Sequence, residues 1–377
     1  MPRILFCCPH AKTKRLGASK VYLEIAEGFR DLDWEVDLIG PEDLGSTGQP
    51  NSSHQYAPLL KDYLRSNAAK YDVIEYEHTH LPYARSFFDD RPLFVARSVL
   101  LHHCVRNANI QTLPKLKNRL SHLIKKNSRE RRSLTVLNQA NETLRYADLV
   151  NVPNTDDKEV LINAGHSPDK IAVIPFGLTK HRLSQFTPAE CPSSLNPIIA
   201  FVGSFDPRKG LREFPEIVQR IVQQKPDLRF RLIGTAGLVP DESGVLSYFP
   251  GHLRKFIEVK PRFDPDELPE LLRPCSLGVF PSHVEGFPFG VLEMLAAGLP
   301  VCAYRTPGAP MMLKSDFLSA KGDGAALATN LLRLLNDHSY LNEARTWARA
   351  RATEFNWDSI IKQTSELYLA RARQNSQ

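Results

Sequence analysis

The stretch from Leu277 to Tyr304 constrains the fold of this chain more than any other. Residues 277–280 are an apolar run that stops at Pro281, as a buried strand does. A loop rich in glycine and proline follows, then an apolar segment of strong helix formers, then a second apolar run from Val301. Strand, loop, helix and strand in this order predict a parallel sheet covered by helices, with the loop at the carboxyl end of the first strand.

The same alternation of β-rich runs and helical patterns continues through both halves of the chain. It predicts an α/β protein with two Rossmann-like domains, whose parallel sheets face each other across a cleft. We expect a first domain over 1–190 and a second over 191–354, with a helix at 355–377 crossing back onto the first. A proline-rich linker is expected within 181–197. The expected strands are 4–8, 35–39, 72–76, 93–97, 149–152 and 171–174 in the first half, and 198–202, 229–233, 256–259, 277–280 and 301–304 in the second.

Length and composition agree with two domains and argue against several classes of protein. A chain of 377 residues with 42% apolar residues suits two ordinary globular cores. The six cysteines show no paired spacing of the metal-binding or redox kind, which favours a reducing, cytoplasmic compartment. We expect no signal peptide, and no transmembrane helix because no run of about 18 apolar residues occurs.

Two carboxylates bracket the loop that follows residues 277–280. Glu285 lies on the loop itself, and Glu293 follows eight residues later, in the first turn of the expected helix. A carboxylate in that turn would complement the helix dipole even without a ligand. With the surrounding sequence PSHVEGFPFGVLEMLAAGLPV, however, the pair resembles the Glu-x7-Glu signature of retaining GT-B glycosyltransferases, the glycosyltransferase family 4-like group.

That resemblance implies a GT-B fold and a role for each part of this loop. In the family the second glutamate holds the ribose of a nucleotide-sugar donor, and here this residue is Glu293. The first, here Glu285, holds the transferred sugar together with loop amides, here those of Pro288 to Val291. Amides at the start of a helix also favour an anion.

A second glycine turn follows the expected strand 198–202. Its sequence over 203–210 is GSFDPRKG, and an amphipathic helix comes next. It resembles the family's Gly-Arg-x4-Lys-Gly phosphate loop, with Ser204 where arginine is usual. Lys209 matches, and we expect the neighbouring Arg208 to replace the missing charge, since preorganised cations stabilise a departing diphosphate. Alone, such a basic pair is more often a solvated turn.

The first half of the chain resembles the family less closely. Gly17 matches half of a Gly-Gly turn that approaches the donor phosphates in the family. The family's cleft histidine is a valine here, so we expect His103, or its neighbour His102, to replace it. His78 and His80 are candidates for contacts with the acceptor.

Two Asp-x-Asp patterns raise the question of a divalent metal ion, which such pairs hold in other glycosyltransferases. Asp31 and Asp33 fall at the end of a helical pattern, where a turn is expected. Asp264 precedes a proline and an acidic helical run, so we expect it to cap a helix. Cations and helix amides would then carry the phosphate charge. We predict a metal-independent enzyme without a cofactor.

A strongly basic segment lies at residues 113–132. Its lysines, arginines and single glutamate sum to +7, against +6 for the whole chain. Leucines and an isoleucine recur there at helical spacing. Such a helix either docks on anionic lipid, at ~1 kcal/mol per cation, or packs on its own domain with solvated cations. We leave peripheral docking on the inner face of the membrane open. No nucleic acid is expected, because the segment lacks aromatic residues for base stacking.

We predict a hexosyltransferase that moves a sugar from a UDP-, GDP- or ADP-sugar to an acceptor hydroxyl, with retention of anomeric configuration. The acceptor would be a glycan, or a lipid-linked or cell-envelope saccharide of polysaccharide biosynthesis. Two alternatives stay open: a non-catalytic subunit of the same fold that binds a nucleotide-sugar or glycan, and a nucleotide-sugar epimerase. The candidate catalytic residues are Arg208, Lys209, Glu285 and His103, and the candidate donor-binding residues are Gly17, Gly203, Ser204, Phe287, Pro288, Phe289, Gly290, Val291 and Glu293.

Overall fold

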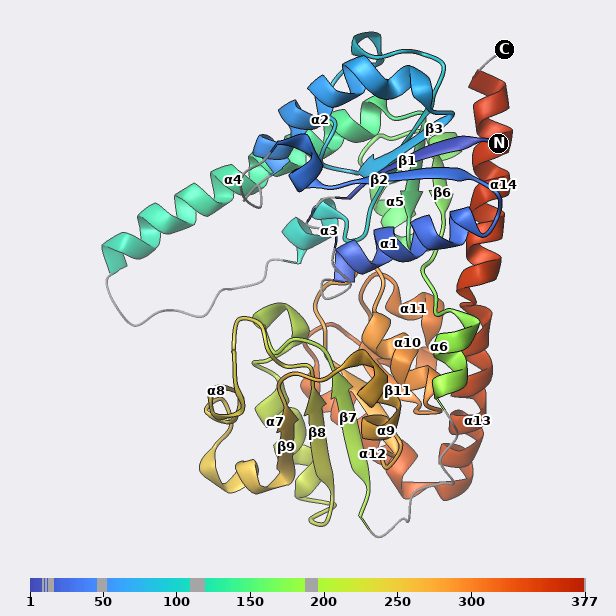
Figure 1. The fold of residues 1–377 in the computed structure, drawn as a ribbon. Coiled ribbons are helices and arrows are strands. Elements are labelled where there is room, and N and C mark those ends of the chain that lie inside the picture. The colour runs from blue at the N-terminus through green and yellow to red at the C-terminus, as the bar shows by residue number, and fades with distance from the viewer. Residues whose placement is uncertain are drawn as a thin grey trace. The chain divides into compact units, whose positions relative to one another are not determined.

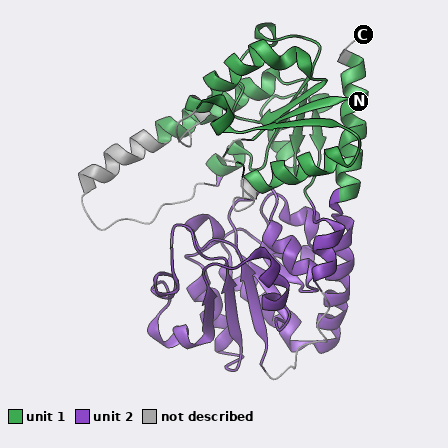
Figure 2. Ribbon diagram, in the orientation of Figure 1, with its two compact units in different colours: residues 1–107, 114–176, 358–377 green, residues 108–113, 177–357 purple. Residues whose placement is uncertain are grey.

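The protein folds into two compact α/β units (Figures 1 and 2). The computed structural model describes residues 1–8, 10, 12, 17–45, 53–108, 119–186 and 196–375. Unit 1 comprises residues 1–107, 114–176 and 358–377, and unit 2 comprises residues 108–113 and 177–357. The chain therefore leaves unit 1 at Phe176, ahead of the segment expected as a linker, and returns to it at Asp358.

Unit 1 is built on a six-stranded parallel sheet. Its elements are β1 (Arg3–Cys7), α1 (Gly17–Arg30), β2 (Glu35–Ile39), α2 (Ser53–Asn67), β3 (Val73–Glu77), β4 (Leu93–Arg97), α3 (His102–Asn107), α4 (Arg119–Tyr146), β5 (Leu149–Val152), α5 (Thr155–Asn163), β6 (Ile171–Val173) and most of α14 (Trp357–Asn375). The strand order is β2-β1-β3-β4-β5-β6. The order reverses between β1 and β3, so the switch point of the sheet lies between these two strands.

Unit 2 repeats this plan. Its elements are α6 (Lys180–Gln185), β7 (Ile198–Val202), α7 (Phe214–Val222), β8 (Arg229–Ile233), α8 (Glu242–Leu246), β9 (Ile257–Lys260), α9 (Leu268–Leu272), β10 (Leu277–Phe280), α10 (Phe289–Ala296), β11 (Val301–Tyr304), α11 (Ala309–Met312), β12 (Leu318–Ser319), α12 (Gly324–Asn336) and α13 (His338–Glu354). The strand order is β12-β11-β10-β7-β8-β9, again with parallel pairing. Here the order reverses between β7 and β10.

The apolar runs of the sequence became strands because both faces of each sheet are covered by helices. Every residue of β10 is buried, as expected for a parallel strand between two helical layers. Most of the expected strands have the predicted bounds, and the others shift by one residue. β12 was not predicted, because two residues give no periodic pattern.

A buried polar network fixes the last helix to the sheet of unit 1. Arg97 on β4 donates two hydrogen bonds to Glu75 on β3, at 2.6 and 3.0 Å, and a third to the hydroxyl of Tyr368 on α14, at 3.1 Å. Tyr368 also hydrogen bonds to Glu75 and to Asn151 on β5. All four side chains are buried, so each charge depends on the others for its partners. This network explains why the end of the chain belongs to unit 1.

The expected turn and helix cap at the two Asp-x-Asp patterns are confirmed. Asp33 lies in the turn after α1 with φ of +60°. Asp264 caps the short 3-10 helix Pro265–Glu267 before α9, where its side chain accepts a hydrogen bond from the amide of Asp266 at 3.1 Å. The amide of Asp264 in turn donates to Oε2 of Glu267 at 3.3 Å, which completes a capping box.

This cap makes a prediction about stability. Asp264→Ala should lower the free energy of unfolding by about 1 kcal/mol, because it leaves amide groups of the helix start without an acceptor. Asp264→Asn should be close to wild type, since asparagine caps equally well. Chemical denaturation followed by circular dichroism measures both. If Asp264→Asn were as damaging as Asp264→Ala, and Mg²⁺ raised the melting temperature of wild type alone, a metal-ligand role would replace the cap.

The basic segment at 113–132 lies largely outside the described residues. α4 begins at Arg119, and its side chains are described from Glu130 onward. Membrane docking through this segment therefore stays a prediction. Within the described ranges, no helix combines the length and the apolar character that crossing a bilayer requires.

Candidate functional site

The loops after β7 and β10 meet at the switch point of the unit 2 sheet. In open α/β sheets, ligands bind outside the carboxyl ends of the strands at this point. The start of α10 packs directly on the end of β7: a Cβ atom added at Gly290 would lie 2.4 Å from the carbonyl oxygen of Val202. Only glycine allows this approach, which brings the helix start against the loop that begins at Gly203.

A buried ion pair joins the two loops. Nζ of Lys209 lies 2.6 Å from Oε1 of Glu285, and the two side chains are 12% and 7% exposed. Ser282 Oγ also donates to this carboxylate. The ammonium group lies 4.8 Å from the ring centre of Phe280, which adds a cation–π contact. The structure thus brings together two of the predicted catalytic residues, each with its charge compensated by the other.

The loop 203–210 holds its cations in a short helical turn. Asp206 caps the 3-10 helix Pro207–Lys209 by accepting hydrogen bonds from the amides of Arg208, at 2.8 Å, and Lys209, at 3.2 Å. Ser204 donates to the same carboxylate at 2.8 Å. Ser204 therefore anchors the cap rather than supplying a charge. The side chain of Arg208 is 34% exposed, and its guanidinium group lies 4.0 Å from Asp206.

Two features of the structure require glycine at position 210, where this turn ends. Its φ of +79° lies in the left-handed region. A Cβ atom there would lie 2.2 Å from the carbonyl oxygen of Pro281, at the end of β10. On the same side, Arg208 accepts hydrogen bonds at its carbonyl oxygen from the amide of His283, at 2.7 Å, and from Ser282 Oγ, at 3.2 Å. The two loops are thus fastened to each other by backbone contacts as well as by the ion pair.

The start of α10 supplies fewer amides than the sequence analysis expected. Pro288 has no N–H and cannot donate, which corrects its predicted role as an amide donor. Phe289 N donates to Phe287 O at 3.0 Å, and Val291 N donates to Pro288 O at 2.9 Å. Of the predicted set, the amide of Gly290 stays the candidate for binding an anion. The side chains of Phe287 and Val291 are buried, so any contact they make with a ligand is through the backbone.

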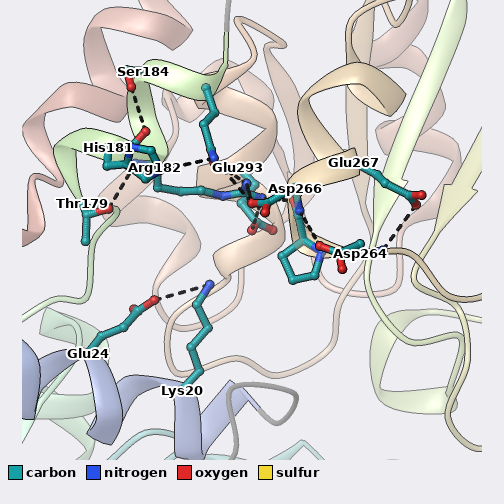
Figure 3. A network of polar contacts seen from close by, with 12 residues as sticks. Lys20, Glu24, Thr179, His181, Arg182, Ser184, Asp264, Asp266, Glu267 and Glu293 are labelled. Carbon is teal, nitrogen blue, oxygen red and sulfur yellow. Dashed lines mark hydrogen bonds and ion pairs between the residues drawn. The ribbon is translucent and has the colours of Figure 1, made fainter.

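Glu293 is the fifth residue of α10, just beyond the first turn, and it takes part in a polar network (Figure 3). Its Oε1 lies 3.9 Å from a guanidinium nitrogen of Arg182 on α6. The same guanidinium donates to the carbonyl oxygen of Pro265 at 2.6 Å. Arg182 therefore connects the helix that carries Glu293 with the turn that precedes α9.

A histidine–glutamate pair next to the site was not found by sequence reasoning. Nε2 of His283 lies 3.0 Å from Oε1 of Glu213, and the His283 ring lies 5.6 Å from that of Tyr304. Burial acts to raise the pKa of Glu213, but the hydrogen bond and charge of His283 outweigh it and lower that pKa. No local sequence pattern predicts this pair, because the partners are far apart in the sequence.

The remaining predicted residues belong to unit 1. Gly17 is the first residue of α1. His103 on α3 is buried; its Nε2 lies 2.8 Å from the side-chain oxygen of Asn141, and burial lowers its pKa to about 4. His78 has both ring nitrogens engaged, by Glu77 at 2.6 Å and by the amide of His102 at 3.2 Å. Those bonds fix the ring of His78, and its contact with an acceptor stays a prediction.

No group of three His, Cys, Asp or Glu residues with metal-binding geometry occurs in the described part of the chain. The charged groups at the switch point include the Lys209–Glu285 pair and the half-buried Arg208 beside Asp206. A site of this kind can bind an anion through a cation, a guanidinium group and a helix amide.

The chain is similar in sequence to known glycosyltransferases. Residues 196–337 match the family model of glycosyl transferases group 1. The chain is 27% identical over 242 residues to a D-inositol 3-phosphate glycosyltransferase of Streptomyces bingchenggensis, covering 58% of this chain and 52% of that protein. It is 26% identical over 226 residues to an MMP alpha-(1->4)-mannosyltransferase of Mycolicibacterium hassiacum, covering 59% and 53%. The chain thus spans about half the length of the curated relatives it matches.

Solved structures agree over nearly the whole chain. Sucrose-phosphate synthase from Thermosynechococcus elongatus matches with a TM-score of 0.75 at 19% identity, covering 98% of this chain and 99% of that one. HepE of Anabaena, in complex with UDP and glucose, matches with a TM-score of 0.69 at 20% identity, covering 98% and 100%. These likenesses, with the two parallel six-stranded sheets, establish the GT-B fold.

Proposed function

We propose that this chain, which carries a group 1 glycosyltransferase domain at residues 196–337, transfers a sugar from a nucleotide-sugar donor to an acceptor hydroxyl. The observation that carries this proposal is the Lys209–Glu285 ion pair, which joins both signature loops at the switch point of the unit 2 sheet. A cation and a carboxylate at this position match the two ends of the reacting bond, a diphosphate and a sugar. The UDP and glucose of the Anabaena structure are consistent with such a donor.

Each charged group of the site has a role in this proposal. Lys209 and Arg208 stabilise the negative charge that develops on the departing diphosphate, and the amide of Gly290 contributes from the helix start. Glu285 accepts hydrogen bonds from hydroxyls of the transferred sugar. Glu293 accepts hydrogen bonds from the ribose.

We further propose retention of configuration at the anomeric carbon. Lys209 and Ser282 both bind the carboxylate of Glu285, which disfavours its attack on that carbon as a nucleophile. The bond from the anomeric carbon to the diphosphate breaks, and its electron pair leaves with the diphosphate. The acceptor oxygen then bonds from the same face, and its proton passes to a phosphate oxygen of the leaving group. The protein groups named above supply the charge stabilisation, and metal independence remains part of the proposal.

One observation favours a second candidate, a non-catalytic subunit that binds a nucleotide-sugar. Ser204 occupies the place of the family's arginine and is tied to Asp206, so the loop has no cation at that position. Such a subunit would bind the donor without cleaving it. We propose that the acceptor is a saccharide or a lipid-linked saccharide. This proposal rests on the sequence alone, as does docking of residues 113–132 on an anionic membrane.

Ligand binding and donor cleavage test the proposal together. One of UDP, GDP and ADP at about a hundredfold its dissociation constant should raise the melting temperature by roughly 5–10 °C, because ligand bound to the native state stabilises it by about 2.7 kcal/mol. The matching nucleotide-sugar should be cleaved in the presence of an acceptor. Stabilisation without cleavage would favour the binding subunit, and no stabilisation by any of the three would refute both candidates.

A further inference from the structure

Glu293 lies beside a cation that comes from a distant part of the chain. Arg182 on α6 places a guanidinium nitrogen 3.9 Å from Oε1 of Glu293, and the side chains are only 12% and 14% exposed. Partial burial weakens the screening of such a pair by water. α6 is not part of either signature loop, and nothing in the sequence around Arg182 marks it as part of a site.

The guanidinium group of Arg182 is fixed by several further contacts, which Figure 3 shows in part. It donates to Pro265 O at 2.6 Å and to Gln185 Oε1 at 2.7 Å, and it lies 5.0 Å from the ring centre of Phe186. These contacts together hold the Arg182 side chain in one conformation. A planar donor group held in this way can fix the direction of a neighbouring carboxylate.

A second carboxylate near Arg182 does not compete strongly with Glu293. Asp266 Oδ1 lies 3.7 Å from Arg182, but the Asp266 side chain is 81% exposed. Exposed pairs contribute little, because water and salt screen them. Glu293 is the partner for which the charge of Arg182 matters most.

We propose that Arg182 is a positioning residue that holds Glu293 oriented to accept two hydrogen bonds from the ribose diol of the donor. This rests on the proposed function, since it presupposes that Glu293 binds ribose. A carboxylate has two acceptor oxygens, and a guanidinium group held beside it can direct them toward both hydroxyls of a diol. Through Pro265, the same guanidinium also ties Glu293 to the turn that follows β9.

The effect should appear in nucleotide affinity and depend on the ribose. With whichever of UDP, GDP and ADP binds wild type, Arg182→Ala should weaken binding about tenfold by calorimetry, within the range of pairwise coupling between contacting residues. Binding of inorganic diphosphate, and of the corresponding 2′,3′-dideoxynucleoside diphosphate, should change by less than twofold. Arg220→Ala, which removes a cation from the exposed pair with Glu216, is the matched control and should bind as wild type does.

A double-mutant cycle separates positioning from a general structural role. If Arg182 acts through Glu293, then Arg182→Ala added to Glu293→Ala should cost almost nothing more. Arg182→Gln keeps hydrogen-bond donors without the charge and should behave like Arg182→Ala, whereas Arg182→Lys should recover part of the affinity. These two variants carry the test if Arg182→Ala does not fold.

Three results would overturn this assignment while the proposed function stands. They are wild-type nucleotide affinity in Arg182→Ala and Arg182→Gln, additive losses in the double mutant, and an equal loss for the dideoxy ligand. Failure of wild type to bind any nucleoside diphosphate would overturn the proposed function, and this assignment with it.

Discussion

Replacing Lys209 with alanine should lower the rate of sugar transfer by on the order of 10²–10³, the cost of removing one preorganised donor to a developing charge. Lys209 is the less exposed of the two cations and lies 2.6 Å from Glu285, whereas Arg208 lies beside Asp206. The measurement is the initial rate of nucleoside diphosphate release at saturating donor. Lys255→Ala, which removes an exposed lysine of the same unit, is the control.

The loss must be separated from a loss of folding, because Lys209→Ala leaves Glu285 buried without its cation. Rates should therefore be measured well below the melting temperature of the variant. The double variant Lys209→Met with Glu285→Gln removes both charges and should fold better while remaining as slow. Transfer at close to the wild-type rate in Lys209→Ala would refute its assignment to the leaving group.

Glu285→Gln should change binding and catalysis in opposite directions. In the structure Glu285 neutralises Lys209, so a diphosphate has to compete with this carboxylate for the ammonium group. Glutamine keeps the shape and the contact with Ser282 but removes the competing charge. Nucleoside diphosphate should bind several-fold to tenfold more tightly, a coupling of about 1 kcal/mol. Transfer should nevertheless fall by roughly 10²-fold, because glutamine accepts less strongly from the sugar as positive charge develops on it.

Calorimetry and initial rates on the same preparation test this pair of effects. Glu216→Gln, at an exposed glutamate of α7, should alter neither quantity. Weaker nucleotide binding in Glu285→Gln would mean that Lys209 serves to hold Glu285 and not the diphosphate.

The elements that carry the site were predictable from the sequence because their patterns are local. β7 and β10 are short apolar runs that end at a glycine turn and at Pro281, and both have the predicted bounds. The cap at Asp264 was readable for the same reason. The Lys209–Glu285 contact joins residues 76 positions apart, so the sequence placed both in one site but did not predict their ion pair.

Other features depend on tertiary contacts that no local pattern encodes. Arg182 reaches Glu293 from α6, and His283 pairs with Glu213 across two loops. The error at Pro288 was of another kind, since the lack of an N–H in proline is evident from the sequence alone. His103 was chosen by its position in the chain, and its low pKa of about 4 leaves the imidazole neutral at pH 7. A neutral ring could accept a proton or a hydrogen bond, but it would not serve as a standing cation.

A crystal structure of the protein with the nucleoside diphosphate that binds it tests the central claim most directly. We predict the diphosphate at the carboxyl ends of β7 and β10, with its oxygens within hydrogen-bond distance of Lys209 Nζ and the amide of Gly290, and with the ribose hydroxyls on Glu293. Lys209 should then have moved from Glu285 toward the phosphate. A nucleotide bound elsewhere, with the Lys209–Glu285 pair intact and no ligand at this switch point, would contradict the account.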